Sequence, residues 1–166
     1  KAIKRRKRLK DVKAAGRLWK HSTLADIDGV VTPQQMDDMF IFTMVRNPWD
    51  RMVSYYHWLQ AQTFQHDAVA LAQTTSFTDF AQSDLIINSF RKTPAQHYMT
   101  DAAGTKRCNA YIRIEHFTKD AATLVDHLGF ELTLDHVNRS DRAQDYRSYY
   151  CEGSRNAVEA ACAVDI

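Results

Sequence analysis

Arg46 and Ser54 lie eight residues apart in the sequence, and their side chains could bind one phosphate together. A guanidinium can donate two parallel hydrogen bonds to phosphate oxygens, and a hydroxyl can donate a further one. At about 100° per residue of a helix, Ser54 lies roughly 140° around the axis from Trp49, and therefore off the apolar side that Trp49 begins. The spacing predicts an anion site between the end of a strand and the helix that follows it.

One stretch of sequence predicts the strand and the helix that position this pair. Residues Met39–Val45 form an unbroken apolar run, which is typical of a strand buried on both faces. Asn47 is a natural N-cap that Asp50 can support, and Pro48 fits the first turn of a helix. Arg46 thus stands at the carboxyl end of a strand, where open α/β sheets bind ligands and where a helix N-terminus favours anions. The following apolar residues recur at helical spacing and form one buried side: Trp49, Met52, Val53, Tyr56 and Leu59.

The remaining sequence alternates between helical and strand-like segments, which predicts an α/β domain. Gly16 and Gly129 are placed to end helices, and Ser76 and Thr118 are placed to begin them. The expected segments are helices at 1–16, 34–38, 77–82, 119–128 and 156–164, an apolar turn at 84–90, and a second strand at 109–117.

Length and composition indicate one globular domain over residues 1–166, with a basic N-terminal helix at 1–16 and a core at 17–166. Of the 166 residues, 45% are apolar and 25% are charged, which is ordinary for a globular protein with a real core. No apolar run is long enough to cross a membrane and no signal peptide is visible, so we expect a cytoplasmic location. The three cysteines are odd in number and widely spaced, which favours reduced thiols over a structural zinc site.

Charge is unevenly distributed along the chain. Residues 1–20 carry ten Lys or Arg and one Asp, a balance of +9, whereas the other 146 residues carry twelve against nineteen, a balance of −7. Two interpretations remain open for Lys1–Lys20: a helix whose charges face water, or a surface that contacts a polyanion such as an acidic glycan or a nucleic acid.

The segment from Val45 to Arg51, continued by Val53 to Tyr56, resembles the phosphate-binding segment of the sulfotransferases. The similarity is to the family that includes the carbohydrate 2-O-sulfotransferases and their bacterial relatives. In that family the first arginine and the serine bind the 3′-phosphate of the sulfate donor, 3′-phosphoadenosine 5′-phosphosulfate. The resemblance implies that role for Arg46 and Ser54. It also implies a three-layer α/β sandwich with a central, mostly parallel sheet, like that of the P-loop nucleotide hydrolases.

The resemblance covers roughly residues 19–60 and 94–166, and it implies further site residues. Arg51 is expected to contact the donor, and Arg139 and Arg142 either contact the nucleotide or lie on the surface. Glu115 closes the second strand and is expected to support the site structurally.

The implied reaction moves a sulfuryl group to a hydroxyl, on a carbohydrate acceptor, and needs no metal. Lys20-His21-Ser22-Thr23 is similar to a family segment whose histidine is the catalytic base, so His21 is the candidate base. The competing hypothesis is that His21 only caps or packs a short helix.

One departure from the family pattern affects the expected activity. Sulfotransferases of this kind begin with a strand and a loop that contains Lys, Gly and Ser or Thr, and that loop holds the 5′-phosphosulfate through its backbone N–H groups. Residues 1–20 contain one Gly and no strand-like run. We therefore expect an N-terminally incomplete domain, and little sulfuryl transfer from these 166 residues alone.

Two other functions fit parts of the sequence. A kinase or another nucleotide-binding enzyme would also need a phosphate loop, and no obvious set of Mg²⁺-binding carboxylates is present. A non-catalytic protein that binds polyanions through Lys1–Lys20 would account for the basic segment. Salt-sensitive binding to heparin-like or nucleic-acid polymers without turnover would favour that second alternative.

Overall fold

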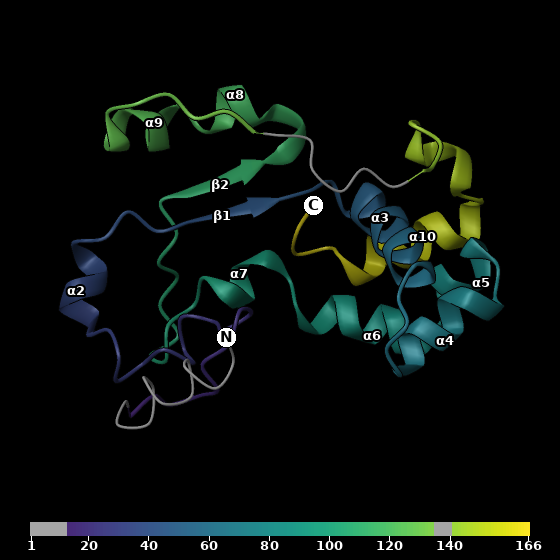
Figure 1. Ribbon diagram of the computed structural model, residues 1–166, viewed down its shortest axis with the longest axis horizontal. Coiled ribbons are helices and arrows are strands. Elements are labelled where there is room, and N and C mark those ends of the chain that lie inside the picture. The colour runs from purple at the N-terminus through teal and green to yellow at the C-terminus, as the bar shows by residue number, and fades with distance from the viewer. Residues whose placement is uncertain (1–12, 135–140) are drawn as a thin grey trace.

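The computed structural model describes residues 13–134 and 141–166, and it shows an α/β protein with a small parallel sheet (Figure 1). About half of the described residues lie in helices. In chain order the elements are α2 (Pro33–Asp37), β1 (Phe42–Val45), α3 (Pro48–Gln60), α4 (Asp67–Thr74), α5 (Phe77–Gln82), α6 (Asp84–Lys92), α7 (Ala95–Tyr98), β2 (Ala110–Arg113), the 3₁₀ turn η1 (Ile114–His116), α8 (Phe117–Asp120), α9 (Ala122–Leu128), the 3₁₀ turn η2 (Tyr146–Tyr149) and α10 (Glu152–Ala161).

The predicted strand, turn and helix around Arg46 are confirmed. Strand β1 is followed after two residues by the 13-residue helix α3, which has Pro48 in its first turn. The side chain of Asn47 caps this helix, because its Oδ1 accepts hydrogen bonds from the backbone N–H groups of Trp49 and Asp50 at 3.1 and 3.3 Å. The predicted apolar side is buried at Met52, Val53, Tyr56 and Leu59.

Strands β1 and β2 pair in parallel, with Val45 opposite Arg113, so their carboxyl ends meet at one edge. Helices α8 and α9 pack on β2 through a small cluster around the fully buried Ile112. The prediction that β1 is buried on both faces is wrong, because Phe42 and Met44 are each 40% exposed. An apolar run reports side-chain type alone, and within the described residues the sheet has only these two strands.

The main core lies among α3, α4, α5, α6 and α10, which gather on one side of the molecule in Figure 1. Phe80 of α5 is fully buried there, with its ring centroid 5.1 Å from that of Tyr56 and 6.2 Å from that of Tyr55. This cluster holds one side of α3 in place. The side that carries Ser54 is left to form the candidate site.

Three expectations about the elements need correction or lie beyond what can be described. Residues 84–90 belong to the nine-residue helix α6, which buries Ile86, Ile87 and Phe90, and are not an isolated apolar turn. Residues 13–16 are not helical, and the rest of the expected helix at 1–16 lies outside the described residues. In the described part of the chain, no helix combines the length and the apolar character that a membrane span requires.

Candidate functional site

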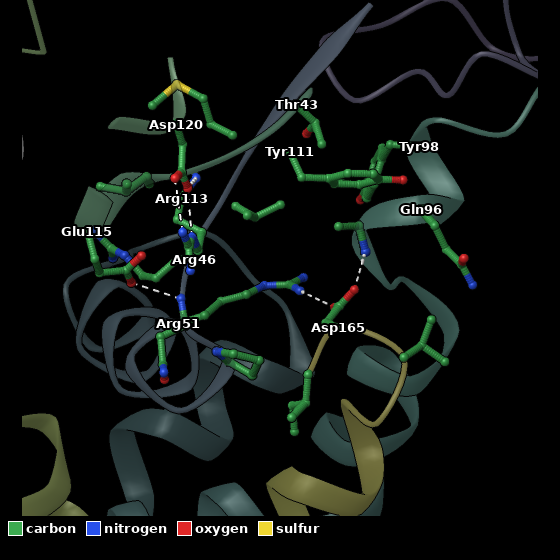
Figure 2. A pocket seen from close by; sticks show the side chains of 18 of the residues that line it. Thr43, Arg46, Arg51, Gln96, Tyr98, Tyr111, Arg113, Glu115, Asp120 and Asp165 are labelled. Atoms are coloured by element: carbon green, nitrogen blue, oxygen red, sulfur yellow. Dashed lines mark hydrogen bonds and ion pairs between the residues drawn. The ribbon is translucent and has the colours of Figure 1, made fainter. Parts of the chain in front are cut away.

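Two cavities meet at the start of α3, and both are lined by Arg46 and Arg51. The first has a volume of about 1220 Å³ and lies at the carboxyl ends of β1 and β2, beside α7 and the C-terminal residues. Figure 2 shows Arg51 reaching from α3 toward Asp165, with Tyr98 and Tyr111 on the same side of the cavity, and Arg46 also lines this cavity. A ligand site at the carboxyl edge of the parallel strands was the expectation from the sequence.

The second cavity, of about 1100 Å³, runs along α3 and is closed by α6, α7 and residues 19–26. It brings together four residues that were singled out from the sequence: His21, Arg46, Arg51 and Ser54. The candidate base and the candidate phosphate ligands therefore border a single volume.

Arg46 and Ser54 are in direct contact. The Nη1 atom of Arg46 donates a hydrogen bond to Ser54 Oγ at 2.7 Å, and the pair is partly buried. The Nε atom of Arg46 lies 3.4 Å from Asp50 Oδ2, which is an ion-pair distance. The carboxylate of Asp50 and the hydroxyl of Ser54 hold the guanidinium against the helix, where it can receive an anion from either cavity.

Asp50 is shared by a second arginine that the sequence did not connect with it. Arg142 Nη2 lies 2.8 Å from Asp50 Oδ1, and the two side chains are only 17% and 16% exposed. Arg142 is therefore partly buried against α3, and a contact between Arg142 and the nucleotide stays a prediction. Its segment is fixed nearby, because the hydroxyl of Tyr150 donates to the carbonyl of Trp49 at 2.9 Å, and burial raises the pKa of Tyr150. No local sequence signal links Arg142 to Asp50, because the contact joins distant parts of the chain.

Two acidic residues fix the strand edge beside Arg46. Glu115 Oε1 accepts a hydrogen bond from the backbone N–H of Asn47 at 2.8 Å, which is the structural role expected of it (Figure 2). Asp120 accepts hydrogen bonds from Arg113 Nε and Nη2 at 2.6 and 2.9 Å. The hydrogen bond from Arg113 lowers the pKa of Asp120 to about 2. Both contacts hold the turn that presents Arg46.

His21 lies on a turn and not on a helix. Ser22 Oγ accepts from the backbone N–H of Trp19 at 2.8 Å and donates to the carbonyl of Arg17, also at 2.8 Å. The imidazole of His21 meets the indole of Trp19 edge-on, with ring centroids 4.7 Å apart. His21 does not cap a helix, because residues 13–32 contain no helix, whereas its contact with Trp19 is the kind of packing role that the competing hypothesis allowed. The exposed side chain also borders the second cavity.

Arg51 is held on the opposite side of the start of α3. Its Nη1 atom lies 3.6 Å from Asp165 Oδ2, and its guanidinium stands over the ring of Phe90, 4.7 Å from the centroid. Arg51 borders both cavities and could therefore reach a bound donor, and this contact stays a prediction. Arg139, the other predicted donor ligand, lies outside the described residues.

The possible metal ligands in the described part of the chain include three cysteines. Cys108, Cys151 and Cys162 are all free thiols. Within residues 13–134 and 141–166, no three His, Cys, Asp or Glu side chains are grouped so that they could hold a metal ion.

Comparison with known proteins adds no assignment. No family model matches the sequence, no curated protein matches it, and no solved structure matches it.

Proposed function

We propose that the protein is a sulfotransferase that binds 3′-phosphoadenosine 5′-phosphosulfate and transfers its sulfuryl group to a hydroxyl, on a carbohydrate acceptor. One observation carries the proposal: Arg46 Nη1 and Ser54 Oγ lie 2.7 Å apart at the start of the helix that follows a parallel strand. The resemblance assigns the 3′-phosphate to the residues at these two positions.

The surroundings of this pair favour an anion. Helix α3 is 13 residues long, and the partial positive charge of its N-terminus lies beside Arg46. The side chain of Arg46 is 30% exposed and borders both cavities, so a phosphate can reach it from the side of Ser54. Arg51, which borders the same two cavities, supplies a second positive charge for the donor.

In the proposed reaction an acceptor oxygen forms a bond to sulfur while the bond from sulfur to the phosphate oxygen breaks. The products are a sulfate ester and 3′-phosphoadenosine 5′-phosphate. The acceptor hydroxyl loses its proton, and His21 is the proposed base because it borders the cavity that contains Arg46 and Ser54. Catalysis of this kind depends on positioning and on stabilising charge.

The proposal extends to the architecture of the domain and to its cellular compartment. We place the two parallel strands and α3 in the central part of a three-layer sandwich of the P-loop type. The exposed Phe42 and Met44 give β1 an apolar surface against which further elements of such a sandwich can pack. Free thiols at all three cysteines suit a reducing compartment such as the cytoplasm.

Replacing Arg46 with alanine is expected to weaken binding of 3′-phosphoadenosine 5′-phosphate by about 1.5–3 kcal/mol, or roughly 10- to 150-fold. The reason is the loss of a charge-assisted contact to the 3′-phosphate. Isothermal titration calorimetry measures the affinity, and circular dichroism checks that the variant is folded.

Arg91→Ala is the matched control, because Arg91 is an exposed arginine on α6 that contacts Asn88 and borders neither cavity. We expect it to leave the affinity unchanged. A folded Arg46→Ala variant that binds the nucleotide as tightly as the parent would contradict the phosphate role of Arg46.

A further inference from the structure

Three buried side-chain nitrogens in the described part of the chain form no hydrogen bond: Arg46 Nε, which lies at an ion-pair distance from Asp50, His57 Nε2 and Arg142 Nη1. Such groups are rare in folded proteins, because a buried donor without an acceptor destabilises the fold. All three nitrogens lie near one face of α3: Arg46 and Arg142 contact Asp50 of this helix, and His57 belongs to it. Their convergence indicates a shared acceptor.

The spacing along the chain explains this convergence. Positions 46, 50, 54 and 57 follow one another at intervals of four, four and three residues, which places their side chains on one face. The contacts of Arg46 with Asp50 and with Ser54 confirm this arrangement for the first three. His57 continues the face and borders the second cavity together with Arg46 and Ser54.

The charges on this face do not balance. Arg46 and Arg142 both contact Asp50, so two cations share one carboxylate in a place where all three side chains are partly buried. His57 does not add a cation, because burial and then the charge of Arg142 lower its pKa, against an opposing effect of Asp141. A neutral imidazole can still donate one hydrogen bond. Among Arg46, Arg142 and Asp50 there is one more positive charge than negative, and the nitrogens without a hydrogen bond are spare donors, which suits an anion.

We infer that the phosphate site extends beyond Arg46 and Ser54 to His57, which binds the phosphate, and to Arg142, which acts through Asp50. The inference rests on the proposed function and assigns two further residues to the same phosphate monoester. Arg142 lies closer to Asp50 than Arg46 does, at 2.8 Å against 3.4 Å. Arg142 thereby neutralises the carboxylate and leaves the charge of Arg46 for the ligand, so it is a positioning residue.

A rescue experiment tests the role of Arg142. In Arg142→Gln the carboxylate of Asp50 is left to neutralise Arg46, and we expect affinity for 3′-phosphoadenosine 5′-phosphate to fall by roughly tenfold or more. Asp50→Asn in the same chain removes that carboxylate charge, so the double variant is expected to recover affinity to within about threefold of the parent. Arg147→Gln is the matched control, because Arg147 is 74% exposed and pairs with Asp145.

A purely structural Arg142 would not be rescued by the second substitution. Calorimetry with inorganic phosphate as a second probe is expected to rank the parent, the Arg142→Gln variant and the double variant in the same order of affinity. An Arg142→Gln variant that binds both probes like the parent, or a double variant that stays weak, would overturn the role of Arg142. Equal affinity of the parent for nucleotides with and without the 3′-phosphate would count against the proposed function, whereas the phosphate series still decides the role of Arg142.

The role of His57 is tested in the parent protein by ¹⁵N NMR of its imidazole. We expect both phosphate and 3′-phosphoadenosine 5′-phosphate to shift the Nε2 resonance of His57 at saturation, because the nitrogen gains an acceptor. His57→Ala is expected to weaken both ligands by roughly tenfold. An unchanged Nε2 resonance at saturation would remove His57 from the site.

Discussion

Replacing His21 with alanine is expected to lower the kcat of sulfuryl transfer by about 10²–10⁴-fold, which is the usual contribution of a general base. His21 borders the cavity that also contains Arg46 and Ser54, and its side chain is exposed on a turn. Because His21 acts on the acceptor, we expect the affinity for 3′-phosphoadenosine 5′-phosphate to stay within about twofold of the parent. The assay is steady-state transfer of labelled sulfate by a form of the protein that carries a phosphosulfate-binding loop.

His97→Ala is the matched control for this prediction. His97 borders the same cavity from α7 and packs edge-on against Tyr98, with ring centroids 5.6 Å apart. We expect its loss to change kcat by no more than a few-fold. A His21→Ala enzyme with a kcat within a few-fold of the parent would remove His21 from the mechanism.

Replacing Phe80 with alanine is expected to destabilise the fold by about 3–5 kcal/mol, because it removes a fully buried ring and leaves a cavity. The ring packs against Tyr55 and Tyr56 of α3, so its loss also weakens the support of the helix that carries Ser54. For a domain of this size each kcal/mol lowers the melting temperature by about 2–4 °C, which predicts a fall of roughly 6–20 °C. Thermal and urea unfolding followed by circular dichroism measure the change.

Phe130→Ala is the control for Phe80, since Phe130 is 58% exposed. We expect it to change the free energy of unfolding by less than about 0.5 kcal/mol. Equal losses from the two substitutions would show that the cluster around Phe80 is not the core that stabilises α3.

The sequence predicted the parts of the fold that depend on local signals. Asn47 and Pro48 mark the start of α3 through capping and backbone geometry, and both effects act within one turn. Ser76 marks the start of α5 in the same way, through a hydrogen bond from the backbone N–H of Asp79 to its side chain at 3.2 Å. These capping contacts form within one turn of the chain and do not depend on the packing around them, so a sequence pattern is enough to predict them.

Other parts of the fold depend on distant packing and could not be predicted in this way. Helix α6 was interpreted as an apolar turn although Ile86, Ile87 and Phe90 recur at helical spacing, and the burial of these residues depends on packing against α5 and α10. The burial of β1 was overestimated, because an apolar run does not report how many strands or helices cover it. In each case the missing information lies in a remote part of the chain.

In the candidate site, too, contacts between residues close in the sequence could be predicted and contacts between distant residues could not. Arg46 and Ser54 could be paired from the sequence because they belong to one strand, turn and helix. The contact between Asp50 and Arg142 could not be predicted, because it joins the start of α3 to a segment that comes after α9. The sequence also could not show that His57 Nε2 is buried without a hydrogen bond, because its surroundings include that distant segment.

A calorimetric titration of the parent protein with two nucleotides tests the proposed function most directly. The ligands are 3′-phosphoadenosine 5′-phosphate and adenosine 5′-phosphate, which differ only in the 3′-phosphate that Arg46 and Ser54 are proposed to bind. We predict at least a roughly tenfold preference for the nucleotide with the 3′-phosphate, since a charge-assisted contact of this kind is worth about 1.5–3 kcal/mol. Equal affinities for the two nucleotides would contradict the proposal.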